Sequence, residues 1–193
     1  MKNIVLAITG ASGAPFGIAV LKELLKTAAV HLIISSNTFS IIADETGLDL
    51  SDNTESKLRK QFSTDNLHFY EDRQMEAPIA SGSFRTDGML VVPCSMKTLA
   101  GIANGYATNL IERAADVTIK EGRHLLLSPR EMPFSAIHLE NMLKLARLGV
   151  TIAPPVPAFY HHPENLEAMT GFITGKILDS FGVGHTLFKQ WGS

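Results

Sequence analysis

The sequence of 193 residues contains one cysteine, one tryptophan and no block of like charges. The single cysteine, Cys94, excludes a disulfide within the chain. Because it lies in the apolar run 89–94, we expect a buried, reduced thiol in a cytoplasmic protein rather than a nucleophile. The formal net charge is -2, and there is no basic stripe of the kind that marks a nucleic-acid surface. Any anionic partner should therefore be small and held by a few placed cations.

Long hydrophobic runs are also missing. The apolar residues 4–8 follow Lys2 and superficially resemble a secretory signal, but they are fewer than the ~7–15 residues of a signal core. No run approaches the ~18–20 apolar residues of a membrane span. We therefore expect a cytoplasmic protein with no membrane partner. The length favours a single domain over residues 1–193.

Short apolar runs alternate with stretches of helical period along the chain. The expected strands are residues 4–9, 30–34, 89–92, 125–127 and 150–153. Helices are expected to begin near Pro15, Ser35 and Ser95 and to cover 111–121, 138–148 and 166–181, with a loop and a short exposed helix within 47–66. This alternation predicts the α/β class, as a Rossmann-like, doubly wound parallel sheet with three layers, α/β/α. Ligands of such sheets bind at the carboxyl ends of the strands, so the loops that follow the strands are the candidate sites.

The first two of these loops are rich in small and polar residues. The segment from Gly10 to Gly13 lacks the G-x-G-x-x-G spacing, but its glycines let a ligand approach the backbone and the helix start offers N–H donors to an anion. A tight turn without a ligand is the alternative. The second strand end, residues 35–37, has no acidic residue for a nicotinamide ribose and no arginine for its phosphate. Its hydroxyl and amide groups suit a phosphate or a ribityl chain, or they only cap a helix.

The next strand ends carry hydroxyls and charges. Ser95 and Thr98 lie three residues apart at a helix start, where they can accept backbone N–H groups or donate to a phosphate. Two prolines flank Arg130 and Glu131, and a charged pair braced at this edge is more typical of function than of a solvated ion pair.

The last loop presents Phe159 and Tyr160 between prolines, where they would pack against a planar or apolar ligand. The adjacent His161 and His162 suggest a metal site at first sight. Consecutive side chains diverge, however, and no cysteine or H-x-x-x-H pattern accompanies them. We therefore expect no metal.

Taken together and in order, six segments resemble the flavin prenyltransferases of the UbiX-like family. The match extends over essentially the whole chain, and the combination is highly specific although no single segment is. The segments are Gly10-Ala11-Ser12-Gly13-Ala14, Ser81-Gly82-Ser83-Phe84, Pro93-Cys94-Ser95-Met96-Lys97-Thr98-Leu99, Glu112-Arg113-Ala114-Ala115-Asp116-Val117, Pro129-Arg130-Glu131 and Pro154-Pro155-Val156-Pro157-Ala158-Phe159-Tyr160.

The resemblance implies a flavoprotein that binds FMN, usually as a homododecamer with its sites at subunit contacts. Members of the family join a dimethylallyl group from dimethylallyl phosphate to N5 and C6 of reduced FMN, without a metal. The prenylated FMN is the cofactor of partner UbiD-type decarboxylases.

The resemblance also implies roles for individual residues. The residues expected to bind FMN are Gly10, Ala11, Ser12, Ser35, Ser95, Met96, Lys97, Thr98 and Arg130. Those expected to bind the prenyl phosphate are Tyr160, Lys176, Arg113 and Lys120. The expected catalytic residues are Glu131, Ser12, Lys120, Arg113 and Trp191. Relatives can carry arginine where this chain has Lys176, which keeps the charge but changes the donor geometry.

The transfer of a prenyl group from its phosphate ester would make use of these residue types. The three cations would stabilise the departing phosphate, and the Tyr160 hydroxyl would hydrogen-bond it. Glu131 would carry protons and Ser12 could relay one at N5. Trp191 would present a π face to the developing allyl cation, or it is a terminal residue packed on a neighbour.

Other functions remain open at this point. One is an FMN-dependent decarboxylase of the cysteine-decarboxylase group, although this chain differs from that group's proline-alanine-serine-alanine-asparagine type motif at residues 93–97. Another is a non-catalytic flavin carrier or accessory subunit of a decarboxylase, which would not need a second phosphate site. A nucleotide-dependent reductase is more distant.

Overall fold

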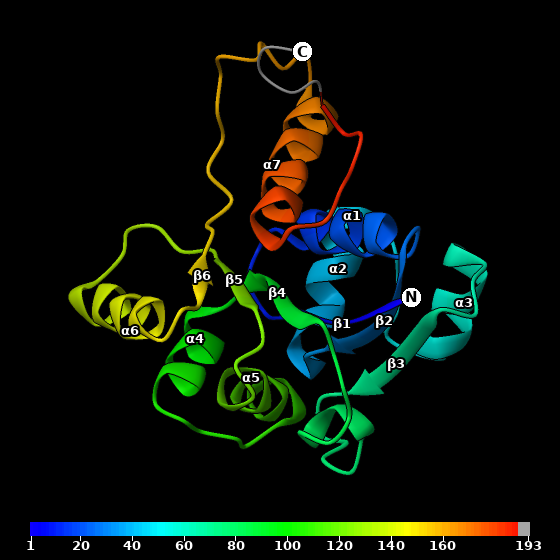
Figure 1. Cartoon of the computed structure of the whole chain (residues 1–193). Helices are drawn as coiled ribbons and strands as arrows, with labels where there is room; N and C mark the ends of the chain where they lie inside the picture. The colour runs from blue at the N-terminus through cyan, green and yellow to red at the C-terminus, as the bar shows by residue number, and fades with distance from the viewer. Residues whose placement is uncertain (189–193) are drawn as a thin grey trace.

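The computed structural model describes residues 1–188, which form a parallel sheet covered by helices on both faces (Figure 1). Every pair of neighbouring strands is parallel, and the order across the sheet is β3-β2-β1-β4-β5-β6. The strand order reverses between β1 and β4, as in a doubly wound sheet. The strands are β1 Lys2–Ile8, β2 Ala28–Ile34, β3 Leu67–Glu71, β4 Gly88–Cys94, β5 Leu125–Pro129 and β6 Thr151–Ile152.

Seven helices connect or follow the strands. They are α1 Ala14–Leu24, α2 Phe39–Thr46, α3 Thr54–Phe62, α4 Met96–Ala103, α5 Leu110–Lys120, α6 Ala136–Arg147 and α7 Leu166–Phe181, with short 3-10 turns at Ser36–Thr38 and Pro78–Ala80. None of the helices in the described part of the chain has both the length and the apolar character needed to cross a membrane.

Alternate side chains of the strands enter two separate cores. On β1, Ile4 and Leu6 pack with α1 and α7, whereas Val5 and Ala7 pack with α4, α5 and α6. Both faces of the central strands are therefore buried, which explains their continuous apolar sequence. Burial of each large aliphatic side chain contributes about 1.5–3 kcal/mol. The prediction of a doubly wound α/β/α fold is confirmed.

Two details differ from the sequence-based expectation. β3 was not expected, because its sequence mixes polar and apolar residues and only Leu67 is buried on this edge strand. β6 is only two residues long.

Cys94 is fully buried, and burial raises the pKa of its thiol far above the usual range. The prediction of a buried, free thiol is confirmed.

The end of the chain forms an arm. Residues 153–165 lead from β6 to the start of α7, and residues 182–188 run back along α7 (Figure 1). The rings of Phe172 and Phe188 lie 4.9 Å apart. A Cβ at Gly175 would lie 2.4 Å from Phe188, so glycine is needed for this close packing. Figure 1 shows the start of α7 on the side away from the sheet.

Candidate functional site

A cleft of about 330 Å³ lies where the carboxyl ends of β1, β2 and β4 meet the start of α5. This is the point at which the strand order reverses, the usual ligand site of such sheets. Seven of the residues expected from the sequence line it: Gly10, Ser35, Ser95, Met96, Lys97, Thr98 and Glu131. Ser36, Asn37, Asp72, Asn109 and Ile111 complete its walls.

The start of α4 supplies the groups best suited to a phosphate. The Ser95 hydroxyl accepts the Thr98 N–H at 3.2 Å and donates to the Thr98 hydroxyl at 3.0 Å, and the Ser95 N–H donates to Thr9 Oγ1 at 2.8 Å. The N–H groups of Met96 and Lys97 precede the first helical hydrogen bonds and have no partner within the helix. With the exposed Lys97 ammonium beside them, these donors attract an anion.

Gly10 leaves open space beside the backbone in this cleft. Its φ is outside the left-handed region, and a Cβ there would come no closer than 3.9 Å to any atom, the nearest being Thr38 Oγ1. Neither conformation nor packing within the chain requires glycine at this position, yet the residue lines the cleft. Together with the hydroxyls and the α4 start, this vacant space fits a flavin nucleotide.

The start of α1 is already occupied by a carboxylate of the chain itself. Glu45 Oε2 accepts the N–H groups of Gly13 and Ala14 at 2.8 and 2.9 Å. These two donors are therefore already engaged within the chain, which favours the start of α4 as the place where an anion would bind. Sequence reasoning missed Glu45 because it lies on α2, more than 30 residues from the loop that it holds.

Arg130 and Glu131, the charged residues predicted to act together at the end of β5, make separate contacts. Arg130 Nε donates to the Ser12 carbonyl at 3.3 Å, which ties the end of β5 to the loop after β1. Glu131 is exposed, faces the cleft, and accepts the Met132 N–H at 3.0 Å. Ala11 is buried beneath the loop and Ser12 is exposed, so only the Ser12 side chain is accessible to a ligand.

Asp72 is a cleft residue that the sequence analysis did not find. Its carboxylate accepts the Ser36 N–H at 3.0 Å and the Ser36 hydroxyl at 3.3 Å. Its carbonyl accepts the Leu110 N–H at 2.7 Å. Asp72 therefore joins the end of β3 to the start of α5. Because β3 itself was not predicted, no strand end pointed to this position.

The residues expected to hold the prenyl phosphate lie elsewhere. Arg113 and Lys120 are on α5, where Arg113 Nη1 lies 3.0 Å from Asp116 and Lys120 pairs with Glu121. The Lys120 hydrogen bond and charge lower the pKa of Glu121.

Tyr160 and Lys176 belong to the arm. Tyr160 lies edge-on to Phe172, with ring centroids 5.7 Å apart, and Lys176 Nζ lies 3.9 Å from Asp179. α5 and α7 cover opposite faces of the sheet, so one chain does not gather the four side chains. Trp191 lies outside the described residues.

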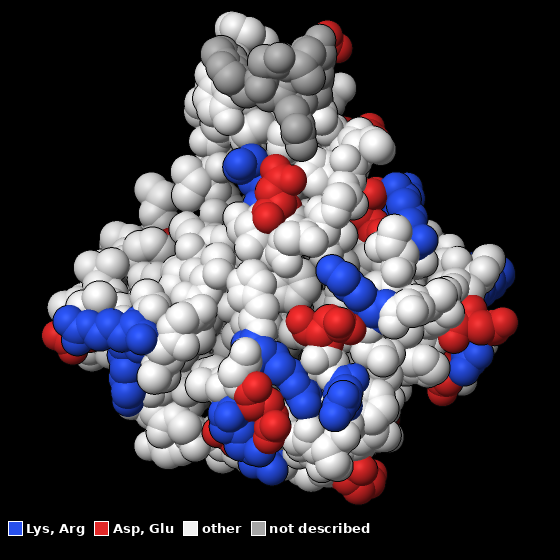
Figure 2. Space-filling model, in the orientation of Figure 1, with Lys and Arg blue, Asp and Glu red and all other residues white. Residues whose placement is uncertain are grey.

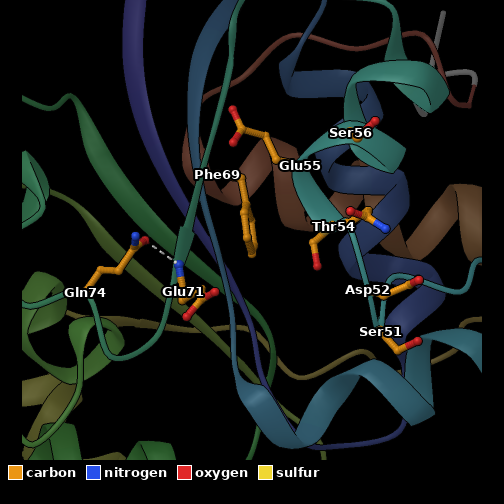
Figure 3. A pocket seen from close by; sticks show the side chains of 9 residues that line it. Ser51, Asp52, Thr54, Glu55, Ser56, Phe69, Glu71 and Gln74 are labelled. Carbon is orange, nitrogen blue, oxygen red and sulfur yellow. Dashed lines mark hydrogen bonds between the residues drawn. The ribbon is translucent and has the colours of Figure 1, made fainter.

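A second hollow of about 520 Å³ lies between β3 and the start of α3 (Figure 3). The carboxylates around it already have partners within the chain: Asp52 pairs with Lys57, Glu55 with Arg59 at 2.8 Å, and Glu71 with Arg73 at 2.7 Å. Because its carboxylates are already paired, this hollow is the weaker candidate for a ligand site.

The surface charges form no single-sign field on the face shown in Figure 2, where basic and acidic side chains alternate. Within residues 1–188, no three His, Cys, Asp or Glu side chains are grouped so as to hold a metal ion. The candidate site therefore depends on hydroxyls, backbone donors and single cations.

Comparison with known proteins identifies relatives over the whole chain. The Flavoprotein family model matches residues 1–176. A flavin prenyltransferase UbiX from Methanocaldococcus jannaschii is 47% identical over 191 residues, which cover 99% of each chain. The crystal structure of AnUbiX (PadA1) in complex with FMN and dimethylallyl pyrophosphate is 44% identical with a TM-score of 0.89, covering 100% of this chain and 98% of that one. A dodecameric FMN-dependent UbiX-like decarboxylase from Escherichia coli O157:H7 is 45% identical with a TM-score of 0.88, covering 100% of both chains.

Decarboxylases of the cysteine group are much more remote. SpaF, an FMN-dependent cysteine decarboxylase, is 12% identical with a TM-score of 0.56, over 80% of this chain and 84% of that one, which shows a shared fold alone. The resemblance drawn from the six sequence segments is confirmed by the closer relatives. The chain belongs to the flavoprotein family and, within it, to the UbiX-type flavin prenyltransferases.

Proposed function

We propose that this chain is a flavin prenyltransferase that transfers a dimethylallyl group from dimethylallyl phosphate to N5 and C6 of reduced FMN. The observation that carries the proposal is the cleft at the point of strand-order reversal, which gathers Gly10, Ser35, Ser95 and Glu131 in a chain 44–47% identical to UbiX proteins. A relative with this sequence similarity is named as binding both FMN and dimethylallyl pyrophosphate.

The residues of the cleft would bind the flavin. The donors at the start of α4 would hold the phosphate, with Lys97 adding charge and Ser35 reaching the ribityl chain. Gly10 would let the ring system lie against the backbone. Arg130 would keep the Ser12 loop in place beside the ring. Reduced FMN supplies nucleophilic N5 and C6 atoms when it is bound.

The cations and Glu131 would perform the transfer. The C–O bond of dimethylallyl phosphate breaks, and Lys120, Arg113 and Lys176 stabilise the phosphate that leaves. Bonds form from the prenyl carbons to N5 and C6, and each of these atoms loses its proton. Glu131 would pass the N5 proton to the phosphate and the C6 proton to the prenyl double bond. Its exposed position at the cleft is compatible with such movement.

We infer that each site is completed by a neighbouring subunit. Arg113 and Lys120 lie on one face of the sheet and Lys176 on the other, so groups from different chains must meet at one flavin. The helix α6 exposes the apolar side chains of Ile137, Leu139 and Leu143, which are suited to a subunit contact. A 45% identical relative is named as dodecameric, and we propose the same assembly here.

Mass spectrometry of the flavin tests the proposed activity. Purified protein is incubated without oxygen with reduced FMN and dimethylallyl phosphate, and the flavin is then released. We expect a species heavier than FMN by one prenyl unit. Recovery of unmodified FMN alone would contradict the proposal and favour a flavin carrier. A parallel incubation without dimethylallyl phosphate is the control.

A Glu131→Gln variant tests the proton transfer. The side chain lines the cleft without an ion pair among the described residues, so its amide should leave FMN binding unchanged. We expect turnover to fall about 100-fold, within the usual range for loss of a proton-transfer group. An unchanged rate would remove Glu131 from the mechanism.

Decarboxylation is the second candidate function, because one 45% identical relative is named an FMN-dependent decarboxylase. It predicts release of carbon dioxide from a carboxylic acid by the protein alone. A flavin prenyltransferase should lead to release of carbon dioxide only when a UbiD-type decarboxylase receives its flavin product. We propose a decarboxylase of that type as the partner. A cytoplasmic location and action as one domain over residues 1–193 stay predictions.

A further inference from the structure

The loop of residues 80–86 crosses the carboxyl-terminal end of α5, where Lys120 and Glu121 pair. The Ala80 carbonyl accepts a hydrogen bond from Arg113 Nε at 3.0 Å. Farther along, Phe84 packs on the core and lies edge-on to His31, with ring centroids 5.1 Å apart. The loop is thus attached to the body of the protein on both sides of its turn.

Arg123, just after α5, holds the rest of this loop. Its Nη2 donates to the Gly82 carbonyl at 2.7 Å, and its Nη1 donates to the Phe84 carbonyl at 2.9 Å and the Thr86 hydroxyl at 3.2 Å. A planar guanidinium can donate to several acceptors at once in fixed directions, whereas an ammonium is a single point of charge. Arg123 therefore fixes the distance between the loop 80–86 and the end of α5.

Gly82 shows how close the loop comes to Lys120. A Cβ at this position would lie 2.3 Å from Glu121 Oε1 and 3.0 Å from Lys120 Nζ. The φ of Gly82 is outside the left-handed region, so a side chain there would displace the ends of Lys120 and Glu121 without straining the backbone. The loop backbone forms a wall against the Lys120–Glu121 pair. A shift of this wall would move the Lys120 ammonium.

We propose that Arg123 is a positioning residue for Lys120, because its fork of hydrogen bonds keeps the loop 80–86 against the Lys120–Glu121 pair. The inference rests on the proposed function, in which the Lys120 ammonium stabilises the phosphate of the prenyl donor. Arg123 does not line the flavin cleft. Its loss should therefore affect the prenyl donor and leave FMN binding intact.

Two variants disturb this arrangement in different ways. Arg123→Lys keeps the charge and removes the fork, whereas Gly82→Ala keeps the fork and displaces the flexible ends of Lys120 and Glu121. Each should raise the KM for dimethylallyl phosphate on the order of tenfold, since small misplacements of a binding group have effects of this size or larger. The Kd for FMN should not change.

Arg85→Lys is the matched control. Arg85 is exposed in the same loop and makes no hydrogen bond or ion pair with any other residue that the structure describes. It should leave the KM at the wild-type value. Equal KM values in the wild type, Arg123→Lys and Gly82→Ala would overturn the inference. If Arg123→Lys does not fold, Gly82→Ala decides, through its KM and through the position of its Lys120 resonance in the measurement below.

A second readout is independent of activity. Lysines are methylated reductively with ¹³C, and the Lys120 resonance is assigned with Lys120→Arg. This resonance should move in Arg123→Lys and stay in place in Arg85→Lys. An unmoved resonance would contradict the positioning role. A moved resonance in a protein whose wild type transfers no prenyl group would support the positioning and contradict only the proposed function.

Discussion

Replacing Gly10 by alanine should affect the stability of the fold and the affinity for a ligand in different ways. The new methyl group would lie 3.9 Å from Thr38 Oγ1 and 4.0 Å from Asn37, which are ordinary contact distances, and the backbone φ is accessible to alanine. Gly→Ala at such a position stabilises a protein by about 0.4–1 kcal/mol, because the unfolded chain loses freedom. The folded protein should therefore be slightly more stable.

The same methyl group would enter the cleft that Gly10 lines. Overfilling a packed contact is unfavourable by about 1–3 kcal/mol, which corresponds to a roughly 5- to 150-fold weaker affinity. We therefore expect Gly10→Ala to bind FMN at least about fivefold more weakly. Stability and affinity should change in opposite directions, which a general defect in folding would not produce.

Urea denaturation without ligand and quenching of FMN fluorescence measure the two effects. Gly184→Ala is the matched control, because a Cβ there has no neighbour within 4 Å, its φ is also outside the left-handed region, and it is remote from the cleft lining. It should raise the free energy of unfolding without affecting FMN. Unchanged FMN affinity in Gly10→Ala would refute the placement of the flavin against this backbone.

Three other changes follow from the same geometry. Burial lowers the pKa of His31 from 6.5 to about 4, and the neighbouring His68 adds to this effect. As the pH drops from 6.5 to 4, His31 therefore binds a proton in the unfolded chain but not in the folded protein. The free energy of unfolding falls over this range. At about 1.4 kcal/mol per pKa unit, this loss of stability reaches roughly 3 kcal/mol. In urea titrations across that range, His31→Phe should remove most of the dependence of the free energy of unfolding on pH. If this dependence remains in the variant, it comes from another group. Ser95→Ala removes the α4 cap and one cleft hydroxyl, so the free energy of unfolding should fall by about 1 kcal/mol and FMN affinity about tenfold; no change in affinity would exclude α4 as the phosphate site. Glu45→Gln weakens the acceptor for two N–H groups and should lower stability by about 1 kcal/mol and slow turnover, while Asp44→Asn beside it should do neither.

The parts of the fold that follow from local pattern were predicted. The apolar central strands could be found because both of their faces are buried, and α7 has the predicted bounds 166–181. Ser95 caps α4 as its residue type suggested. β3 could not be found, since an edge strand with one solvated face carries polar residues such as His68 and Glu71.

The candidate site was predictable only where its residues follow strands directly. Glu45 reaches the start of α1 through helix packing, Asp72 reaches the cleft at the end of an unpredicted strand, and no local motif marks either residue. Lys120 and Lys176 were expected beside one flavin, but the chain places them on helices of opposite faces. The spacing of residues along a sequence does not reveal contributions from a second chain.

Co-expression of two defective variants tests most directly whether the site combines groups from different chains. Lys120→Ala and Lys176→Ala should each be nearly inactive alone, since each lacks one of the cations that stabilise the leaving phosphate. In mixed oligomers, verified by native mass spectrometry, random assembly should restore about one quarter of the wild-type prenyl transfer, because that fraction of sites receives both intact groups from different chains. No recovery in verified mixed oligomers would contradict the account, because the two groups would then have to act from the same chain.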